Sequence, residues 1–327
     1  MLLISLDTTN AHFNLAAEEY LLKEKEEDIF MLWRNDNAII VGKNQNSLGE
    51  INREKAEEKN VAVVRRLTGG GAVYHDLGNL NYTFIMKNDG SDFLNFRKFS
   101  EPVIKALNEM GVKASLSGRN DLLIEDKKFS GNAQCVHKNR MLHHGTLMFK
   151  TNINLLSEVL NVDRSKIESK GIASVKSRVT NISEHLPDKS ITVTDFRDKL
   201  LQSVGADLSG AVMYSLTDED VSAINKLKNE KYDTWEWNFG FSPRYTFNKN
   251  MRFTGGSVEA YLYIKNGVIE SAKIRGDFFA KNDISEFEML LLGTKHECSE
   301  ILRQFDKVDI KKYFGNISKD EIMRVLI

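Results

Sequence analysis

The chain has 327 residues, of which 28% are charged, and a formal net charge of −1. Such a balanced charge argues against a nucleic-acid-binding protein, which would usually carry a basic excess, and no apolar run reaches the roughly 18 residues that cross a bilayer. The two cysteines, Cys135 and Cys298, lie far apart in a chain too long to need a disulfide framework. Since no signal peptide is recognisable, we expect a cytoplasmic protein.

Strand and helix patterns alternate through about the first 150 residues, which predicts a mixed α/β (α+β) fold. The first segment, LLISLDTTNAHFNLAAEEYLLKEK, is typical of a strand, a Thr/Asn turn and a helix. The run NLNYTFIMK (79–87) alternates as a half-buried strand does, and Gly111 is a typical helix stop. Further strands are predicted at 30–34, 38–46 and 61–67, and helices at 51–60 and 96–111.

The second half of the chain changes in character. Helices are predicted at INLLSEVLN (153–161) and TVTDFRDKLLQSV (192–204), the latter with Thr194 as its N-cap. Between them, residues 164–184 are polar and weakly periodic, as in a lid over a site or a plain surface connection. From about residue 250 the pattern predicts a small α+β domain: strands with a hairpin at Asn266-Gly267, a helix at 284–293 and two short final helices. WEWNFG (235–240) is a reasonable hinge.

Residues 65–76, RRLTGGGAVYHD, indicate an anion site. Three glycines follow an apolar run and the pair Arg65-Arg66. Glycine lets backbone N–H groups approach a ligand closely, and adjacent cations favour phosphate or carboxylate. A glycine-rich turn with surface arginines is the alternative.

A second polar motif, GRNDLLIEDKKFSGNAQ, spans residues 118–134 and is followed by HHGTL at 143–147. LLIED is a predicted strand, and a turn containing Asp126 and Lys127 leads into a second run. Such a hairpin would return Lys128 beside Asn120 and Asp121. A lone lysine is usually a solvated surface residue, but one followed by Phe-Ser-Gly is less typical of a surface turn.

Together these motifs resemble those of the lipoate–protein ligase family. RRLTGGGAVYHDLGN matches the family's arginine pair, triple glycine, Ala-Val, aromatic, His-Asp and Gly-Asn, and the elements GRND, K-x-SG-x-A and HHGTL follow in order. The resemblance continues through KGIASVKSRVTNISE (170–184), WEWNFGFSPRYTF (235–247), RFTGGSVE (252–259) and KIRGDFF (273–279). It therefore covers nearly the whole chain.

The resemblance implies a large mixed-sheet catalytic domain of the biotin/lipoate ligase type at residues 1–245 and a small α+β C-terminal accessory domain at 246–327. It also implies a two-step activity. Lipoate is activated with ATP and Mg²⁺ to lipoyl-AMP, and the lipoyl group passes to a lysine of a lipoyl-domain protein. The family's acceptors are acyltransferase subunits of 2-oxoacid dehydrogenases and the H-protein of glycine cleavage. We further expect a monomer that binds neither nucleic acid nor membrane.

The resemblance also implies site residues. Lys128 matches the family's catalytic lysine and would bridge the lipoyl carboxyl oxygen and the α-phosphate, while Arg66 would offset phosphate charge. Asp121 would hold Mg²⁺ or orient Lys128, and the sequence does not choose between these roles. The other residues expected to bind ATP or lipoyl-AMP are Gly71, Ala72, Val73, Tyr74, Asn79, Gly131, His144, Thr146 and, in the loop that would close over the adenylate, Ser177, Arg178 and Asn181. For His75 and His144 a packing role is favoured over a positioning role.

Two other functions remain open. A cysteine-dependent octanoyl or lipoyl transferase of the same fold would need a reactive thiolate. Cys135 follows the lysine motif, whereas the transferase cysteine is expected upstream of it, so a small buried residue is the simpler reading. A non-catalytic lipoate-binding protein would not need Lys128. Walker A, G-x-G-x-x-G and G-x-S-x-G motifs are absent, and a zinc site at His137, His143 and His144 lacks ligand-like spacing.

Overall fold

The chain divides into two compact units, Met1–Asn238 and Phe239–Ile327. This computed structural model describes residues 1–327 except 46, 48–50, 52, 89–93, 118–119, 153–177, 242–244 and 279. The helix predicted at 153–161, most of the predicted lid and Ser177 lie outside the described residues. The predicted boundary at 245/246, with a catalytic and an accessory role on either side, stays a prediction.

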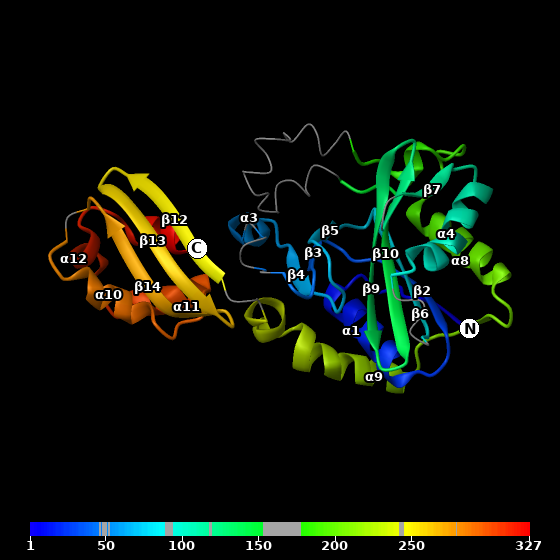
Figure 1. Ribbon diagram of the computed structural model, residues 1–327, viewed down its shortest axis with the longest axis horizontal. Coiled ribbons are helices and arrows are strands. Elements are labelled where there is room, and N and C mark those ends of the chain that lie inside the picture. The colour runs from blue at the N-terminus through cyan, green and yellow to red at the C-terminus, as the bar shows by residue number, and fades with distance from the viewer. Residues whose placement is uncertain are drawn as a thin grey trace. The chain divides into compact units, whose positions relative to one another are not determined.

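One mixed sheet of eight strands forms the centre of the larger unit (Figure 1). The strands lie in the order β11-β1-β2-β6-β10-β9-β8-β7. The pairs β11/β1 and β1/β2 are parallel, and every later pair is antiparallel. The strands are β1 (Leu2–Ser5), β2 (Ile29–Trp33), β6 (Asn79–Lys87), β7 (Ala114–Ser117), β8 (Asp121–Ile124), β9 (Lys127–His137), β10 (Arg140–Met148) and β11 (Val212–Met213).

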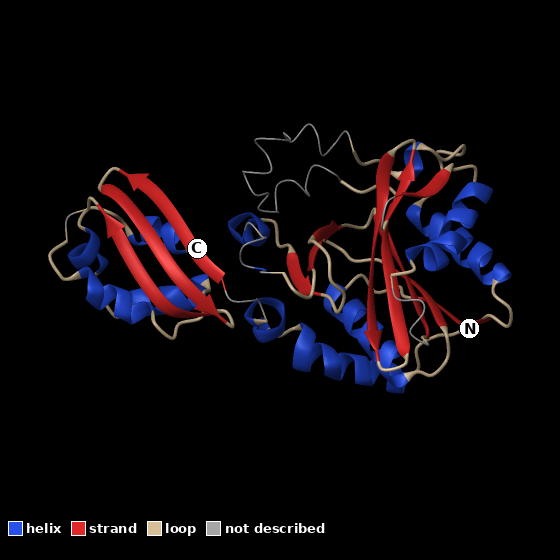
Figure 2. Cartoon of the chain, in the orientation of Figure 1, coloured by secondary structure: helices blue, strands red, loops and turns tan. Residues whose placement is uncertain are grey.

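Both faces of this sheet are covered, as Figure 2 shows. Helices α4 (Phe96–Glu109) and α8 (Val193–Asp207) pack on one face through an apolar cluster that includes Phe99 and Phe196. Helix α1 (Ala11–Glu24), capped by the Asn10 side chain, lies on the other face with a second, three-stranded sheet. That sheet has the order β4-β3-β5, with β3 (Ala38–Val41), β4 (Ala62–Arg65) and β5 (Val73–His75), and the short helix α3 (Arg53–Glu58) joins β3 to β4.

Strand β6 is not half-buried as predicted, because both of its faces are covered. Leu80, Tyr82 and Phe84 enter the cluster under α4 and α8, while Ile85 enters the cluster on the α1 face. The alternating polar residues, Asn79, Asn81 and Thr83, are at most 2% exposed and point to the α1 face. The alternation in the sequence is therefore real, but its polar half faces the interior of the protein.

Two local predictions at element ends were wrong. The strand predicted at 38–46 ends at Val41, since the chain turns at Gly42 to run beside the glycine loop. Helix α8 begins at Val193 with Thr192 as its N-cap, not Thr194. The Thr192 side chain accepts from the N–H of Asp195, and the Asp195 carboxylate accepts from the N–H of Thr192. This capping box satisfies two backbone donors at once, which Thr194 could not do from within the first turn.

The smaller unit has a three-stranded antiparallel sheet in the order β12-β13-β14, with one face covered by helices. The predicted hairpin is confirmed: Asn266 and Gly267 both have positive φ (51° and 73°), as a two-residue turn requires. Three short helices, not two, follow α10, because the apolar face of the sheet needs cover along its whole length. The elements are β12 (Tyr245–Phe253), β13 (Gly256–Lys265), β14 (Val268–Gly276), α10 (Ile284–Leu291), α11 (Cys298–Phe305), α12 (Ile310–Phe314) and α13 (Lys319–Leu326).

The mixed α/β fold class is thus confirmed. Within the described part of the chain, no helix combines the length and apolar character that crossing a membrane requires.

A buried carboxylate fastens α1 to helix α9 (Asp218–Leu227). Asp220 accepts from Tyr20 Oη at 2.7 Å and Tyr214 Oη at 2.5 Å, and lies 2.8 Å from Lys25 Nζ. The carboxylate also accepts from the backbone N–H of Thr217. Because Asp220 is 2% exposed, removing its carboxylate leaves four polar groups without that partner.

We expect Asp220→Ala to lower the free energy of unfolding by about 3 kcal/mol, the range typical of breaking a buried polar network. Denaturant unfolding monitored by circular dichroism measures this. Asp218→Ala is the matched control, because Asp218 is exposed in the same first turn and should contribute about 0.5 kcal/mol. Equal effects of the two changes would contradict the prediction.

Candidate active site

A cavity of about 210 Å³ lies in the larger unit, bounded by the central sheet, α1 and the small sheet. It collects residues from both sequence motifs. The predicted residues that line it are Arg66, Gly71, Ala72, Val73, Lys128, Gly131, His144 and Thr146. His75 also lines it. The lining residues that the sequence did not single out as site residues are Leu15, Trp33, Ile40, Gly70, Asn81, Asn120, Asn132, Ala133 and Gly145.

The floor of the cavity is built by strand pairing. Asn81 on β6 lies between Trp33 on β2 and Thr146 on β10 in the sheet register. His144 on β10 pairs with Ala133 on β9. Since side chains alternate across a sheet, these positions present one polar and small-residue patch to the interior.

The predicted hairpin is confirmed and places Lys128 at the cavity wall. β8 and β9 pair around a turn at Glu125-Asp126, both with positive φ, and Lys127 already belongs to β9. Lys128 Nζ lies 2.8 Å from Asp121 Oδ1, with both side chains about 40% exposed. A Cβ atom on Gly131 would lie 3.2 Å from Lys128 Nζ, so a glycine there leaves room for the ammonium group.

The backbone of Lys128 is held from the other side by the segment that follows the undescribed range. Its N–H donates to Arg178 O at 2.7 Å, and its carbonyl accepts from the N–H of Thr180 at 3.0 Å. These bonds form a parallel bridge between Lys128 and Val179. The chain around Arg178 is therefore directly beside the candidate catalytic lysine.

Arg66 organises the glycine loop. Its guanidinium donates to the carbonyls of Ile40, Gly69 and Gly71 at 2.6–3.0 Å, and its Nε donates to Thr68 Oγ1 at 2.9 Å. Burial lowers the pKa of Arg66 to about 10. Four of its five N–H groups are thus used to shape the loop, which fixes where the backbone of the loop faces the cavity.

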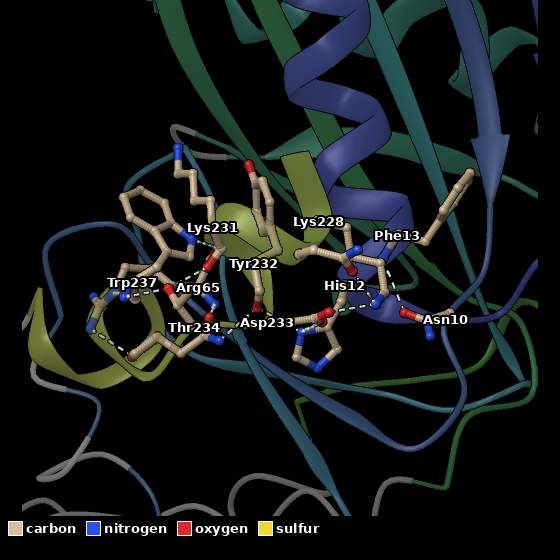
Figure 3. Close-up of polar contacts among 12 residues, drawn as sticks. Asn10, His12, Phe13, Arg65, Lys228, Lys231, Tyr232, Asp233, Thr234 and Trp237 are labelled. Carbon is tan, nitrogen blue, oxygen red and sulfur yellow. Dashed lines mark hydrogen bonds and ion pairs between the residues drawn. The ribbon is translucent and has the colours of Figure 1, made fainter. Parts of the chain in front are cut away.

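The other arginine of the pair has a different set of partners. Figure 3 shows Arg65 beside Trp237, whose indole Nε1 donates to Arg65 O at 2.8 Å. Lys231 Nζ lies 3.8 Å from the centre of the Trp237 ring. The Arg65 guanidinium, at 2.5–3.1 Å, donates to Ser47 Oγ and to the carbonyls of Gly42, Lys43, Gln45, Trp237 and Asn238. Arg65 thereby ties the turn after β3 to the end of the larger unit.

The turn after β3 also packs directly on the glycine loop. A Cβ atom on Gly42 would lie 1.9 Å from the carbonyl oxygen of Gly70, and the N–H of Lys43 donates to Thr68 O at 2.8 Å. The position of the glycine loop therefore depends on the absence of a side chain at Gly42.

Glu18 on α1 supports the cavity from behind, and the sequence-based site did not include it. Its carboxylate accepts from Thr83 Oγ1 at 2.6 Å and lies 2.9 Å from His144 Nδ1. His144 Nε2 in turn lies 2.8 Å from Thr68 Oγ1. Glu18 stands three residues after Leu15, so helical spacing predicts that it lies on the buried face of α1. A carboxylate at a predicted buried position is the sequence signal that could have identified Glu18 as part of the site.

Several predicted residues lie outside the cavity lining. Tyr74 points to the opposite side of β5, where its hydroxyl donates to Asn37 Oδ1. Asn181 is buried and caps the backbone of Thr151, with its Oδ1 accepting and its Nδ2 donating. Arg178 is exposed, and Asn79 Nδ2 donates to Asn81 Oδ1. Their predicted roles in binding stay predictions.

Cys135, for which the sequence favours a small buried residue, is half-buried. It packs against the apolar cluster under α1. Burial raises the pKa of its thiol to about 12, and the charge of Glu18 acts in the same direction. A thiolate nucleophile is therefore disfavoured at this position. The part of the chain that the structure describes contains no group of three or more His, Cys, Asp or Glu side chains that could hold a metal ion.

Two buried histidines predict a dependence of stability on pH. Burial lowers the pKa of His75 to about 3, and burial also lowers the pKa of His143 well below its ordinary value. Below about pH 6.5 these histidines take up protons in the unfolded chain but stay neutral in the folded chain, so the free energy of unfolding falls as the pH falls.

We expect each of these histidines to contribute a slope of about 1.4 kcal/mol per pH unit below pH 6. Urea unfolding at pH 7, 6 and 5 measures the slope. His143→Asn should be less stable at pH 7 yet show a shallower slope, since one titrating group is gone. An unchanged slope would contradict the assignment.

Two family models match the chain. The lipoyl protein ligase A/B catalytic domain matches residues 10–205, and the bacterial lipoate protein ligase C-terminus matches residues 242–326. A lipoate-protein ligase of Bacillus subtilis is 48% identical over 317 residues, which is 96% of each chain.

Solved structures of lipoate–protein ligases are also similar to this chain. The bipartite lipoate protein ligase of Thermoplasma acidophilum, described with its E2 lipoyl domain, superposes with a TM-score of 0.67 at 29% identity, over 73% of this chain and 96% of that one. A lipoate-protein ligase A bound with ATP gives a TM-score of 0.64 at 27% identity, over 73% and 98%. P. falciparum LipL1 in complex with lipoate gives 0.62 at 28% identity, over 99% and 97%.

Proposed function

Because this chain belongs to the lipoate–protein ligase family, we propose that it joins lipoate to ATP as lipoyl-AMP and then transfers the lipoyl group to a lysine of a lipoyl-domain protein. The observation that carries the proposal is the placement of Lys128. Its ammonium group lies at the wall of a cavity that the glycine loop also bounds. Relatives of similar fold bind ATP and lipoate, which are the two molecules that such a cavity must hold together.

In the first step a carboxylate oxygen of lipoate attacks the α-phosphorus, a P–O bond breaks and pyrophosphate leaves. The carboxylate is already ionised at neutral pH, so no general base is needed. The difficulty is to hold two anions in contact, which is a task of position and charge. Lys128 suits it because an ammonium group can donate to several oxygens at once.

The glycine loop supplies the second part of the site. Gly71, Ala72 and Val73 carry small side chains and line the cavity, so the adenylate could approach the backbone there, and Val73 would also border the acyl chain. Arg66 adds a buried positive charge near the phosphates. One of its five N–H groups has no partner among the described residues and can be directed toward them. Tyr74 and Asn79 would act by fixing the backbone around this stretch.

Asp121 is the residue that fits Mg²⁺. One carboxylate together with substrate phosphates is a typical set of ligands for this ion. Asp121 is 40% exposed and lies against Lys128, so it can either share the ion with the phosphates or orient the lysine. Bound Mg²⁺ would neutralise phosphate charge.

In the second step the amine of an acceptor lysine attacks the acyl carbonyl and AMP leaves. We assign closure over the adenylate to Ser177, Arg178 and Asn181, and the position of Arg178 beside the Lys128 backbone supports this. The protein acts as a cytoplasmic monomer on lipoyl-domain proteins, in keeping with the E2 lipoyl domain described with the T. acidophilum ligase.

Lipoate-dependent exchange of pyrophosphate into ATP, followed by the mass of an apo lipoyl domain, tests the proposal. Exchange together with a lipoyl mass gain supports a complete ligase. Exchange without transfer restricts the activity to the first step. Acyl transfer without ATP would overturn the proposal in favour of the transferase, and Cys135→Ala would then abolish that transfer.

A further inference from the structure

Two buried nitrogen atoms in the wall of the cavity have no hydrogen-bond partner among the described residues. They are Nε2 of His75 and Nδ2 of Asn81. Both residues line the cavity, and they are only 3% and 2% exposed. A buried polar group without a hydrogen-bond partner is destabilising. Two such groups in one cavity therefore indicate that a bound ligand supplies the missing acceptors.

The hydrogen-bond network fixes His75 Nε2 as a donor. Asn14 Nδ2 shares its two hydrogens among three acceptors within 3.1 Å, the carbonyls of Thr8 and Arg34 and Asn35 Oδ1. Because the Asn35 side chain points its Oδ1 toward Asn14, its Nδ2 faces His75 Nδ1 at 3.1 Å. An amide nitrogen only donates, so Nδ1 accepts and the ring proton lies on Nε2. Burial, together with the charge of Arg66, lowers the pKa of His75 to about 3, so the ring is neutral at pH 7.

The amide of Asn81 is oriented in a similar way. Its Oδ1 accepts from Asn79 Nδ2 at 2.9 Å, which leaves its own Nδ2 as the unpartnered end. Asn81 pairs with Trp33 in the sheet, and the Trp33 ring lies 6.3 Å from the ring of His75. Trp33 is thus a neighbour of both residues, through strand pairing with Asn81 on β6 and through a ring contact with His75 on β5.

We propose that His75 and Asn81 form a subsite in which two neutral N–H donors bind uncharged hydrogen-bond acceptors of a substrate. The inference rests on the proposed function and names two further residues that touch the ligand. In the same cavity Lys128 and Arg66 carry the positive charge suited to phosphate and carboxylate. The two neutral donors suit either ring nitrogens of the nucleotide base or the acyl carbonyl oxygen of the adenylate.

Equilibrium binding of three probes to the full chain tests the subsite: a non-hydrolysable ATP analogue, lipoate, and a non-hydrolysable lipoyl-adenylate analogue. We expect Asn81→Leu and His75→Leu each to weaken binding at least tenfold for one or more probes. His75→Gln keeps an N–H near the position of Nε2 and should stay within about threefold of wild type. A loss with the ATP analogue identifies the base, and a loss confined to the adenylate analogue identifies the acyl carbonyl.

Stability separates binding from packing. Asn81→Leu removes the unpartnered donor but also the acceptor of the buried Asn79 Nδ2, so the melting temperature without ligand should fall. A saturating probe should then raise the melting temperature of Asn81→Leu by less than that of wild type, whereas a purely structural asparagine would give equal rises. Asn139→Leu, in the exposed turn between β9 and β10, is the control for the same exchange of side chains. If wild type binds the probes and both leucine variants bind them within threefold, the subsite is overturned while the proposed function stands. If wild type binds none of them, the proposed function itself fails.

Discussion

Replacing Lys128 by alanine is expected to slow lipoate-dependent pyrophosphate exchange by about 10²–10³-fold, the effect of removing one donor from a developing charge. The loss should appear in kcat, because the ammonium group is needed most when the two anions are pressed together. Folding should be little affected. The Lys128–Asp121 pair is about 40% exposed on each side, and such pairs contribute less than about 1 kcal/mol.

Lys127→Ala is the matched control. Lys127 precedes Lys128 on β9, is exposed, and projects from the opposite face of the strand. The Lys127→Ala variant removes the same charge from the same hairpin but leaves the ammonium group of Lys128 in place. It should therefore retain near-wild-type pyrophosphate exchange. If both variants lose activity equally, a general charge effect and not a positioned ammonium group would be responsible. If Lys128→Ala retained full exchange, the central role given to Lys128 would be wrong.

Gly42→Ala is expected to have the second largest effect, although Gly42 does not line the cavity. A Cβ atom there would lie 1.9 Å from the Gly70 carbonyl oxygen, and that atom belongs to the backbone of the glycine loop. The loop must shift, and it carries with it the bonds from Arg66 to Gly69 and Gly71. We expect the free energy of unfolding to fall by about 1–3 kcal/mol, as in overpacked sites, and the KM for ATP to rise at least tenfold.

Gly69→Ala is the steric comparison for stability. A Cβ atom at Gly69 meets nothing within 4 Å among the described residues, and its backbone does not have positive φ. Its free energy of unfolding should change by less than about 0.5 kcal/mol. Equal destabilisation by the two changes would show that the loop is sensitive to any substitution, and that its contact with Gly42 is not special.

The parts of the site that could be predicted are those that are local in sequence. Asp121 and Lys128 are seven positions apart and meet through one hairpin whose turn residues are visible in the chain. Leu15, Trp33 and Asn81 come from three separate elements, and only the packing of α1 on the sheet and the order of the strands bring them to one cavity. No pattern within any one of these segments reveals that order.

Arg65 shows that a local sequence pattern does not identify the groups that a side chain binds. An arginine pair beside three glycines suggested a bound anion, yet the guanidinium of Arg65 binds backbone carbonyls from both Gly42 and Trp237. The second of these lies 172 positions away. Likewise, the alternation at 79–87 predicts one solvent-exposed face. The polar half instead faces the interior, where Asn81 lines the cavity, and alternation does not distinguish such an interior from solvent.

The connections that close the larger unit also constrain the order in which the chain can be completed during synthesis. Strand β1 lies between β2 and β11, so one of its neighbours is not made until Val212 and Met213 emerge. The hydrogen bonds of Arg65 form later still, because two of its acceptors, the carbonyls of Trp237 and Asn238, are translated after β11. On a ribosome adding roughly 5–20 residues per second, the N-terminal strand is available for many seconds before its sheet can be finished. The meander β12-β13-β14, by contrast, pairs each strand with the next one made. The smaller unit, which is translated last, can therefore pair its strands soonest after they are made. The N-terminal strand stays unpaired longest and depends most on protection from premature association.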